Sequence, residues 1–234
     1  MAFALEEPTM RKTLGLCFLA LTLIAATAHA QGVFLEKGQP GISATAGAAA
    51  IGTGWTASVT PSYTYRGMFD VGLDVTRYSY TKGDANGLSA IGLMPFATAY
   101  FTRSDDGPWP VSISGTLAVQ RRLFMGNGAA PNPDGWGLLL GASVFRRVDF
   151  SSSIAGIPEL FVGYDLQSIT WHSTTVDAGS ATRGLGQKTK YDHNMRLFLR
   201  PNVAFKAEKI TYTVGPYVGY QAGFAIGANL GAIF

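Results

Sequence analysis

Apolar and polar side chains alternate at every second position through most of this chain. In the segment 55–66, one face carries tryptophan, alanine, valine, proline and tyrosine, and the other carries serine, threonine and one arginine. Successive side chains of a β-strand point to opposite faces, so this period-two pattern predicts a strand with one apolar and one polar face. The segments 109–123 and 191–206 show the same alternation. The chain is therefore expected to be all-β.

Ten such segments occur, each about long enough for a tilted membrane strand of roughly 9 to 11 residues. Their predicted ranges are 41–51, 55–66, 68–80, 88–102, 109–123, 136–150, 157–171, 191–206, 210–221 and 223–234. The connections after odd-numbered segments include the long stretches 125–135 and 173–190, whereas those after even-numbered segments are shorter. This arrangement predicts a closed antiparallel transmembrane β-barrel with short periplasmic turns and long external loops.

The strand count has an alternative. Pro61, Pro95, Pro201 and Pro216 lie inside predicted strands, where each removes a donor from the hydrogen-bond ladder. The segment 88–102 is also apolar on both faces. A barrel of eight strands with an internal or interfacial element therefore stays open beside the ten-stranded one.

The composition is unlike that of a soluble domain. Charged residues make up only 14% of the chain, against about a quarter in soluble domains. Beyond residue 30, no apolar run approaches the roughly 18 residues of a membrane helix, so a membrane location would require strands. The net charge of +3 is small and evenly spread, and no nucleic-acid partner is expected.

Alternation alone does not say which face is outside, because a secreted soluble barrel would show the same pattern reversed. The apolar faces are almost free of charge, and the opposite faces consist of glycine and small polar residues with a few charges, which favours lipid outside and a cramped polar lumen inside. The four tryptophans lie near strand ends, as an aromatic girdle requires. They are Trp55, Trp109, Trp136 and Trp171, the last in the inward phase.

The first thirty residues read as a secretory signal peptide. Arg11 and Lys12 precede an apolar stretch at 14–26, and Ala28-His29-Ala30 offers a small-x-small cleavage site, with Met10 as the better start. The predicted divisions are a signal at 1–30, a periplasmic lead-in at 31–40 and a barrel at 41–234. The only cysteine, Cys17, lies within the signal, so neither a disulfide nor a thiolate metal site is expected in the mature chain.

The last segment alternates apolar residues with small or polar ones up to a terminal phenylalanine. Phe224, Leu230 and Phe234 all belong to its apolar face. This pattern resembles the carboxy-terminal signal of bacterial outer-membrane β-barrel proteins, and together with the signal peptide the resemblance covers 41–234. It implies the outer membrane of a Gram-negative-type bacterium as location, and outer-membrane lipid and the barrel assembly machinery as partners. The pattern says nothing about which member of the class this is.

Charged residues in the inward phase predict a network in the lumen. They are Asp70, Asp74, Arg122, Arg147, Glu159, Asp165, Arg196, Arg200 and Lys206. In an antiparallel hairpin, the residue numbers of two paired positions always add up to the same value. Asp165 with Arg200 and Glu159 with Lys206 both give 365, so one register would pair both. A register that pairs Asp165 with Arg196 competes with this one. The network is interpreted as a salt-bridge core, with a narrow solute or ion path as the alternative.

The sequence predicts a monomeric cell-envelope barrel with a structural, adhesive or narrowly permeating role, and the loops 125–135 and 173–190 as contact surfaces. A porin-like wide channel is not expected, because such channels need about 16 strands or more. Neither a cofactor nor a metal ion is expected. His172 and His193 lie near the predicted external rim, so a hydrolase acting on lipid or peptide is one alternative. A soluble barrel binding a small apolar ligand is the other.

Overall fold

The structure, a computed structural model, describes residues 34–35, 37–82, 86–104, 108–125, 133–175, 184–221 and 223–234, with the backbone alone for 171–175 and 184–188. The signal peptide predicted at 1–30 lies outside the described residues. Eleven strands are present in the described part. They are β1 (Gly41–Ile51), β2 (Gly54–Tyr65), β3 (Phe69–Tyr80), β4 (Ser89–Thr102), β5 (Ser112–Met125), β6 (Asp134–Phe145), β7 (Val148–Asp149), β8 (Ile154–Thr175), β9 (Gly184–Ala207), β10 (Ile210–Gln221) and β11 (Phe224–Ile233).

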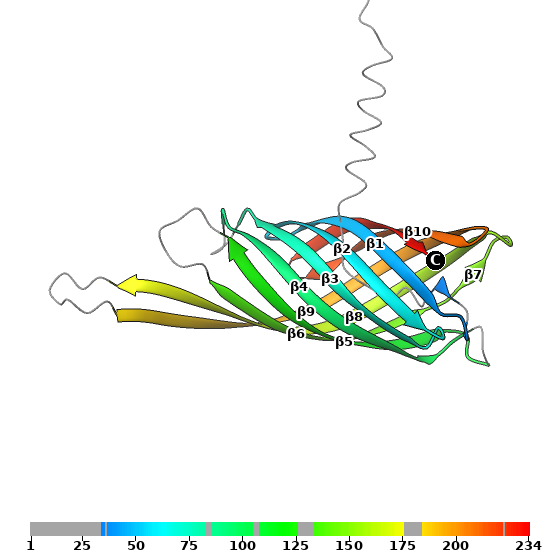
Figure 1. The fold of residues 1–234 in the computed structure, drawn as a ribbon, viewed down its shortest axis with the longest axis horizontal. Coiled ribbons are helices and arrows are strands. Elements are labelled where there is room, and N and C mark those ends of the chain that lie inside the picture. Colours follow the sequence, from blue (N-terminus) through cyan, green and yellow to red (C-terminus); the bar gives the residue numbers. More distant parts are fainter. Residues whose placement is uncertain are drawn as a thin grey trace, which may run out of the picture.

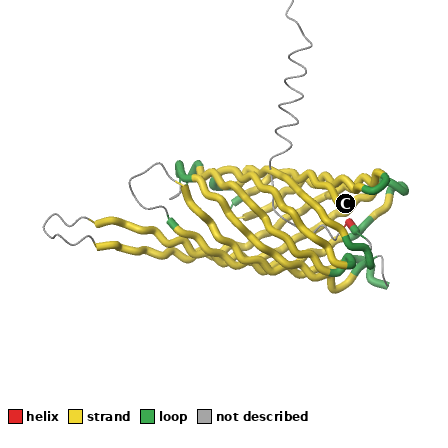
Figure 2. Tube along the Cα trace, viewed as in Figure 1, coloured by secondary structure: helices red, strands yellow, loops and turns green. Residues whose placement is uncertain are grey.

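The sheet closes on itself. Each long strand pairs antiparallel with its neighbours in the chain, β6 pairs with β8, and β1 pairs with β11 from Ser43↔Ile233 to Ala50↔Ile226. The result is a barrel of ten long strands. The strands are tilted relative to the barrel axis (Figures 1 and 2). Among the described residues, the two-residue β7 pairs only with the start of β8. No helix of the described residues is long and apolar enough to cross a membrane.

The ten-stranded prediction is confirmed, and the alternative with an internal element at 88–102 is wrong. β4 pairs with β3 from Phe69↔Ala99 to Ser79↔Ser89, and also with β5 on its other side. Its apolar inner face is explained by its neighbours inside the barrel, because Met94 and Phe96 join an apolar cluster there. A strand that faces lipid on one side and apolar side chains on the other is apolar on both faces.

The four strand prolines are accommodated on the outer surface, where each side chain is exposed. The ladders lose pairs around them: β4–β5 pairing is interrupted between Leu93 and Phe96, and β9–β10 pairing between Val214 and Val218. Proline lacks the N–H that the ladder needs. The barrel therefore keeps its closure with local gaps in hydrogen bonding.

The apolar face of each strand points outward. Val59 and Leu199 are 54% and 52% exposed, whereas their chain neighbours Thr60 and Arg200 are 2% and 1% exposed. A soluble barrel would bury the apolar set and expose the polar one. The soluble-barrel alternative is therefore wrong, and the exterior suits lipid.

The predicted girdle tryptophans lie at the ends of the wall. Trp55 and Trp136 are exposed at the ends of β2 and β6 that face the long loops, and Trp109 is exposed at the opposite end, just before β5. The side chain of Trp171 lies outside the described residues. Large aromatic side chains also flank the last strand, where Phe224 and Phe234 are 64% and 63% exposed, while Leu230 is half-buried on the outward face.

Candidate functional site

The middle of the barrel is filled by an apolar cluster that sequence reasoning missed. Its large members are Met94, Phe96, Leu139, Phe161, Phe198 and Tyr217, all buried. The Phe161 and Phe198 rings lie 6.4 Å apart, and Phe198 meets Tyr217 edge-on at 5.6 Å. These side chains come from five of the ten long strands, β4, β6, β8, β9 and β10, so the cluster occupies the lumen along much of its wall. Small barrels have interiors just wide enough for side chains to fill, and here the filling is apolar at mid-height.

Glycines make room for the rings. A Cβ placed on Gly141 would lie 2.5 Å from the Phe161 ring, and one on Gly163 would lie 2.8 Å from it. Gly141 and Gly163 face each other across the β6–β8 ladder. Because these two glycines of β6 and β8 have no side chains, they leave the space that the Phe161 ring occupies. The signal was present in the sequence, because Phe161 shares the inward phase of Glu159 and Asp165.

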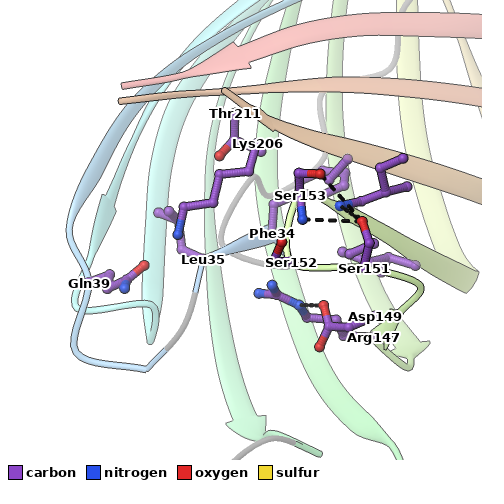
Figure 3. A pocket seen from close by; sticks show the side chains of 14 residues that line it. Phe34, Leu35, Gln39, Arg147, Asp149, Ser151, Ser152, Ser153, Lys206 and Thr211 are labelled. Carbon is purple, nitrogen blue, oxygen red and sulfur yellow. Dashed lines mark hydrogen bonds and ion pairs between the residues drawn. The ribbon is translucent and has the colours of Figure 1, made fainter. Parts of the chain in front are cut away.

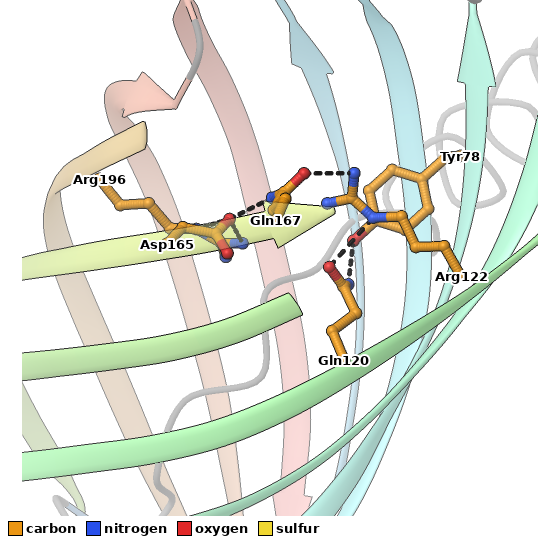
Figure 4. A network of polar contacts seen from close by, with 6 residues as sticks. All are labelled: Tyr78, Gln120, Arg122, Asp165, Gln167 and Arg196. Atoms are coloured by element: carbon orange, nitrogen blue, oxygen red, sulfur yellow. Dashed lines mark hydrogen bonds and ion pairs between the residues drawn. The ribbon is translucent and has the colours of Figure 1, made fainter. Parts of the chain in front are cut away.

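On the external side of this cluster, a chain of polar contacts crosses the lumen (Figure 4). The Gln120 side-chain amide donates to the Tyr78 hydroxyl at 2.7 Å, and Arg122 donates to Gln120 at 3.0 Å and to Gln167 at 2.7 Å. Gln167 donates in turn to Asp165. Asp165 completes the chain by accepting from Arg196, with Nε at 3.1 Å.

This network joins β3, β5, β8 and β9, and it places the buried Arg122 against a tyrosine ring. The Arg122 guanidinium lies 4.7 Å from the centre of the Tyr78 ring. A buried charge is stable only when it is paired and hydrogen-bonded. The Asp165–Arg196 ion pair meets that condition, with side chains 2% and 4% exposed.

On the periplasmic side of the cluster, a second ion pair lies directly beneath the rings. Arg200 and Glu159 are joined at 3.3 Å, and Ser143 donates to the same carboxylate at 2.6 Å. The Arg200 guanidinium lies 5.0 Å from the centre of the Phe161 ring and 5.2 Å from that of Phe198. The charged pair thus supports the aromatic cluster from below, and cation–π attraction adds to the ion pair.

Asp70 and Asp74 also point inward, where hydroxyl groups hold them. Tyr100 donates to Asp70 at 2.8 Å, and Thr60 donates to Asp74 at 2.9 Å. Thr76 also donates to Asp74. Both aspartates are almost fully buried. Seven of the nine residues predicted for the lumen network, all but Arg147 and Lys206, are buried in the structure. Arg122, Asp165 and Arg196 lie on the external side of the aromatic cluster, Glu159 and Arg200 lie on its periplasmic side, and Asp74 faces Met94 of the cluster across the β3–β4 ladder.

The predicted register of the β8–β9 hairpin is wrong. Glu159 pairs with Arg200 and Asp165 with Asn194, so partner numbers sum to 359 and not to 365. The competing sum of 361 is wrong as well, although its ion pair forms: Arg196 reaches Asp165 diagonally from the next inward position. All three sums are odd, and each keeps the same residues facing lipid. Alternation therefore could not distinguish between these registers.

Arg147 and Lys206 are placed at the periplasmic mouth and not in the lumen wall, as Figure 3 shows. β6 ends at Phe145, because the chain turns there toward β7, and Arg147 pairs with Asp149 at 2.8 Å in this exposed turn. Lys206 lies near the end of β9. Both cations line a small hollow of about 60 Å³, together with Ser151, Ser152 and Ser153.

The segment before β1 folds into the periplasmic mouth. Phe34 packs against Tyr100, Phe145 and Ile157. The Arg103 side chain donates to the carbonyl oxygen of Gly67 at 2.7 Å and also to that of Leu35. The lead-in residues described therefore narrow this end of the barrel.

His193 lies on the outer wall, where it is exposed. Its Nδ1 lies 3.1 Å from the Tyr164 hydroxyl, which also faces outward. The neighbouring Asp192 is in the opposite phase, 3.7 Å from Lys190. The side chain of His172 lies outside the described residues. The structure therefore does not bring His193 and Asp192 together as a hydrolytic pair.

The β8–β9 hairpin continues past the rim. β6 pairs with β8 only as far as Asp134↔Thr170, but β8 and β9 stay paired to Thr175↔Gly184. On the other side, the β9–β10 ladder ends at Gln221↔Arg196, and no described residue of β10 pairs with residues 184–195 of β9. At about 3.3 Å per residue, that stretch spans roughly 35 Å. Figure 1 shows the resulting two-stranded ribbon standing out from one end of the barrel.

Ten strands closed edge to edge, an apolar exterior and a filled interior define an antiparallel transmembrane β-barrel of the outer-membrane class. No protein-family model and no curated protein matches the sequence.

Solved structures with a similar fold include three bacterial proteins. Neisserial surface protein A (NspA) is 11% identical over 83% of this chain and 92% of that one, with a TM-score of 0.38. The beta domain of the Bordetella autotransporter BrkA is 12% identical over 85% and 99%, with a TM-score of 0.49. Ail, the attachment invasion locus protein of Yersinia pestis, is 9% identical over 85% and 97%, with a TM-score of 0.38. At these identities and scores the likenesses carry no function to this chain.

Proposed function

We propose that this chain is a surface-contact protein of a bacterial outer membrane, in which a sealed barrel anchors the β8–β9 hairpin and presents it outside the cell. The observation that carries the proposal is the hairpin itself. Five residue pairs of β8 and β9, from Trp171↔Lys188 to Thr175↔Gly184, lie beyond the last β6 partner. A two-stranded ribbon that leaves the membrane offers both free edges to a partner outside the cell.

The filled interior supports an anchoring role over permeation. Phe161, Phe198 and Tyr217 project into the lumen from the adjacent strands β8, β9 and β10, where they form one cluster with Met94 and Phe96 of β4, and ion pairs are buried on both sides of this cluster. A channel needs polar walls around a water-filled path. The mid-height of this barrel offers aromatic rings in contact.

The experiment shortens the hairpin without touching the barrel. Thr170 and Thr189 face each other, with hydroxyl oxygens 3.0 Å apart, so an Asn-Gly turn can join them in place of residues 171–188. Cells that display the full chain are compared with cells that display the shortened one, for attachment to a cultured epithelial monolayer. Heat-modifiable migration on a denaturing gel checks that both barrels fold.

We expect the full chain to raise attachment above that of vector-only cells, and the shortened chain to return it to that level. Equal attachment by the full and shortened chains, both folded, would contradict the assignment to the hairpin. Attachment at the vector-only level by the full chain would contradict the contact function as a whole.

A further inference from the structure

A row of four outward residues crosses the external end of the wall. The ladder places Arg121 on β5 opposite Trp136 on β6, Trp136 opposite Ser168 on β8, and Ser168 opposite Tyr191 on β9. Neighbouring strands lie about 4.8 Å apart, so the row is about 14 Å long. In order, it presents a cation, an aromatic ring, a small hydroxyl side chain and a second aromatic ring.

The two rings enclose a groove on the outer surface. Trp136 and Tyr191 are 55% and 72% exposed, and between them the small Ser168 leaves the wall low. The hollow has a volume of about 380 Å³ and is also lined by Leu166 and His193. The backbones that carry the two rings are separated by two strand spacings, about 10 Å. That width suits one ring-shaped group lying over Ser168.

Arg121 is held at the end of this row. Its guanidinium lies 4.6 Å from the centre of the Trp136 ring, and Nη2 donates to Asp134 at 2.7 Å. Asp134 occupies one of the five N–H donors of the guanidinium. The remaining donors form the fork geometry that matches a phosphate.

We propose that this row binds the phosphorylated sugar headgroup of a glycolipid in the external leaflet. The sugar ring lies in the groove, with its C–H faces against Trp136 and Tyr191, and a phosphate group reaches Arg121. Charge complementarity and the aromatic walls favour this occupant over a phospholipid, which offers phosphate without a sugar ring. The inference rests on the outer-membrane location in the proposed function, since it needs the groove to face that leaflet.

The test uses the mature chain folded in phosphatidylcholine vesicles, to which bisphosphorylated lipid A is added. The readout is the temperature at which the compact band on a denaturing gel is lost, followed as a function of lipid A content. We expect lipid A to raise this temperature. We expect Arg121→Gln to weaken the apparent affinity roughly tenfold, as the loss of a charge-assisted contact would. Trp136→Ala and Tyr191→Ala should each weaken it as well.

Arg66→Gln is the matched control. Arg66 lies 5.3 Å from the centre of the Tyr65 ring at the periplasmic rim, so it has the same kind of cation–aromatic contact at the wrong end of the barrel. The affinity of the Arg66→Gln variant for lipid A should equal that of the unmodified chain. Folding of every variant is checked in phosphatidylcholine alone, where loss of the compact band would reveal a failure to fold. If Arg121→Gln does not fold, Arg121→Lys takes its place, and if Trp136→Ala does not fold, Trp136→Phe takes its place.

Two further lipids identify the recognised chemistry. Dephosphorylated lipid A should bind more weakly. Phosphatidylglycerol at equal charge should raise the temperature at which the compact band is lost by less than lipid A does. An equal effect of phosphatidylglycerol would overturn the sugar site, and unchanged affinity in all three groove variants would overturn the row. Crosslinking of two chains through the groove in place of lipid binding would show that a second copy covers it. If the chain does not insert into phosphatidylcholine vesicles at all, the membrane location fails, and with it the proposed function.

Discussion

Glu159 and Arg200 face each other across the β8–β9 ladder and form an ion pair of 3.3 Å with side chains 4% and 1% exposed. The pair lies beneath the Phe161 and Phe198 rings, both of which the Arg200 guanidinium contacts. The ion pair therefore stabilises the aromatic cluster from its periplasmic side. We expect the free-energy effects of mutations in the pair and in the two rings to be non-additive.

Removal of one partner should be much worse than removal of both. Arg200→Met leaves the Glu159 carboxylate buried without its cation, and we expect it to lower the free energy of unfolding by about 3 to 5 kcal/mol. Adding Glu159→Gln should recover more than half of that loss. Urea unfolding in vesicles measures both values. Lys206→Met, at the exposed end of β9, is the control and should change stability by about 0.5 kcal/mol or less.

The aromatic cluster should keep the barrel closed to ions. We expect the unmodified chain in planar bilayers to show no porin-like conductance, and Phe161→Ala combined with Phe198→Ala to raise conductance by opening the lumen at mid-height. Leu199→Ala is a fitting control, because Leu199 is next to Phe198 in the chain but 52% exposed on the outer wall. Large conductance in the unmodified chain would show that the seal does not hold.

A charge on the outer wall should be costly in proportion to its depth. Val162 is 42% exposed near the middle of the wall portion of β8, and Val162→Arg is expected to cost about 2 to 4 kcal/mol. Tyr212→Arg, near the start of β10 at the periplasmic side of the wall, should cost about 0 to 1 kcal/mol. Unfolding titrations in vesicles give both values. Equal and negligible costs would mean that water, and not hydrocarbon, surrounds the wall.

The paired glycines should resist enlargement. The Phe161 ring occupies the space where Gly141 and Gly163 lack side chains, so Gly141→Ala is expected to destabilise the barrel by about 1 to 3 kcal/mol through overpacking. Adding Phe161→Leu to the Gly141→Ala variant should restore part of the lost stability, because the shorter leucine side chain leaves room for the new methyl group. If Gly141→Ala were harmless, the ring would have room that the present packing does not show.

Several features of the fold follow from local pattern. Alternation over ten segments predicted ten staves, and the near absence of charge on the apolar faces predicted that these faces point outward. Both were confirmed, because a strand offers only two faces and each local stretch reports which one is polar. The inward position of Asp70, Asp74 and Arg122 followed from the same parity.

Other features depend on how the strands are aligned and packed against one another, which alternation within one strand does not report. The register of β8 against β9 differs by six in its residue sum from the predicted one, because even shifts leave every side chain on its own face. Arg147 left the lumen because β6 stops at Phe145. Phe161 and Phe198 face each other across the β8–β9 ladder, so the packing of their rings depends on that same register. Closure of the barrel then brings Met94 and Phe96 of β4 into the same cluster.

The sequence by itself determined which residues share the apolar side of each strand, since this follows from the period of the pattern. It favoured ten strands, and the pairings of β4 with β3 and β5 excluded the eight-stranded alternative. Only the tertiary structure decided which inward charges meet, how aromatic rings fill the lumen and which outward side chains line up in one row. These depend on strand register and barrel closure, which are set by packing among all ten staves together and not by any one of them.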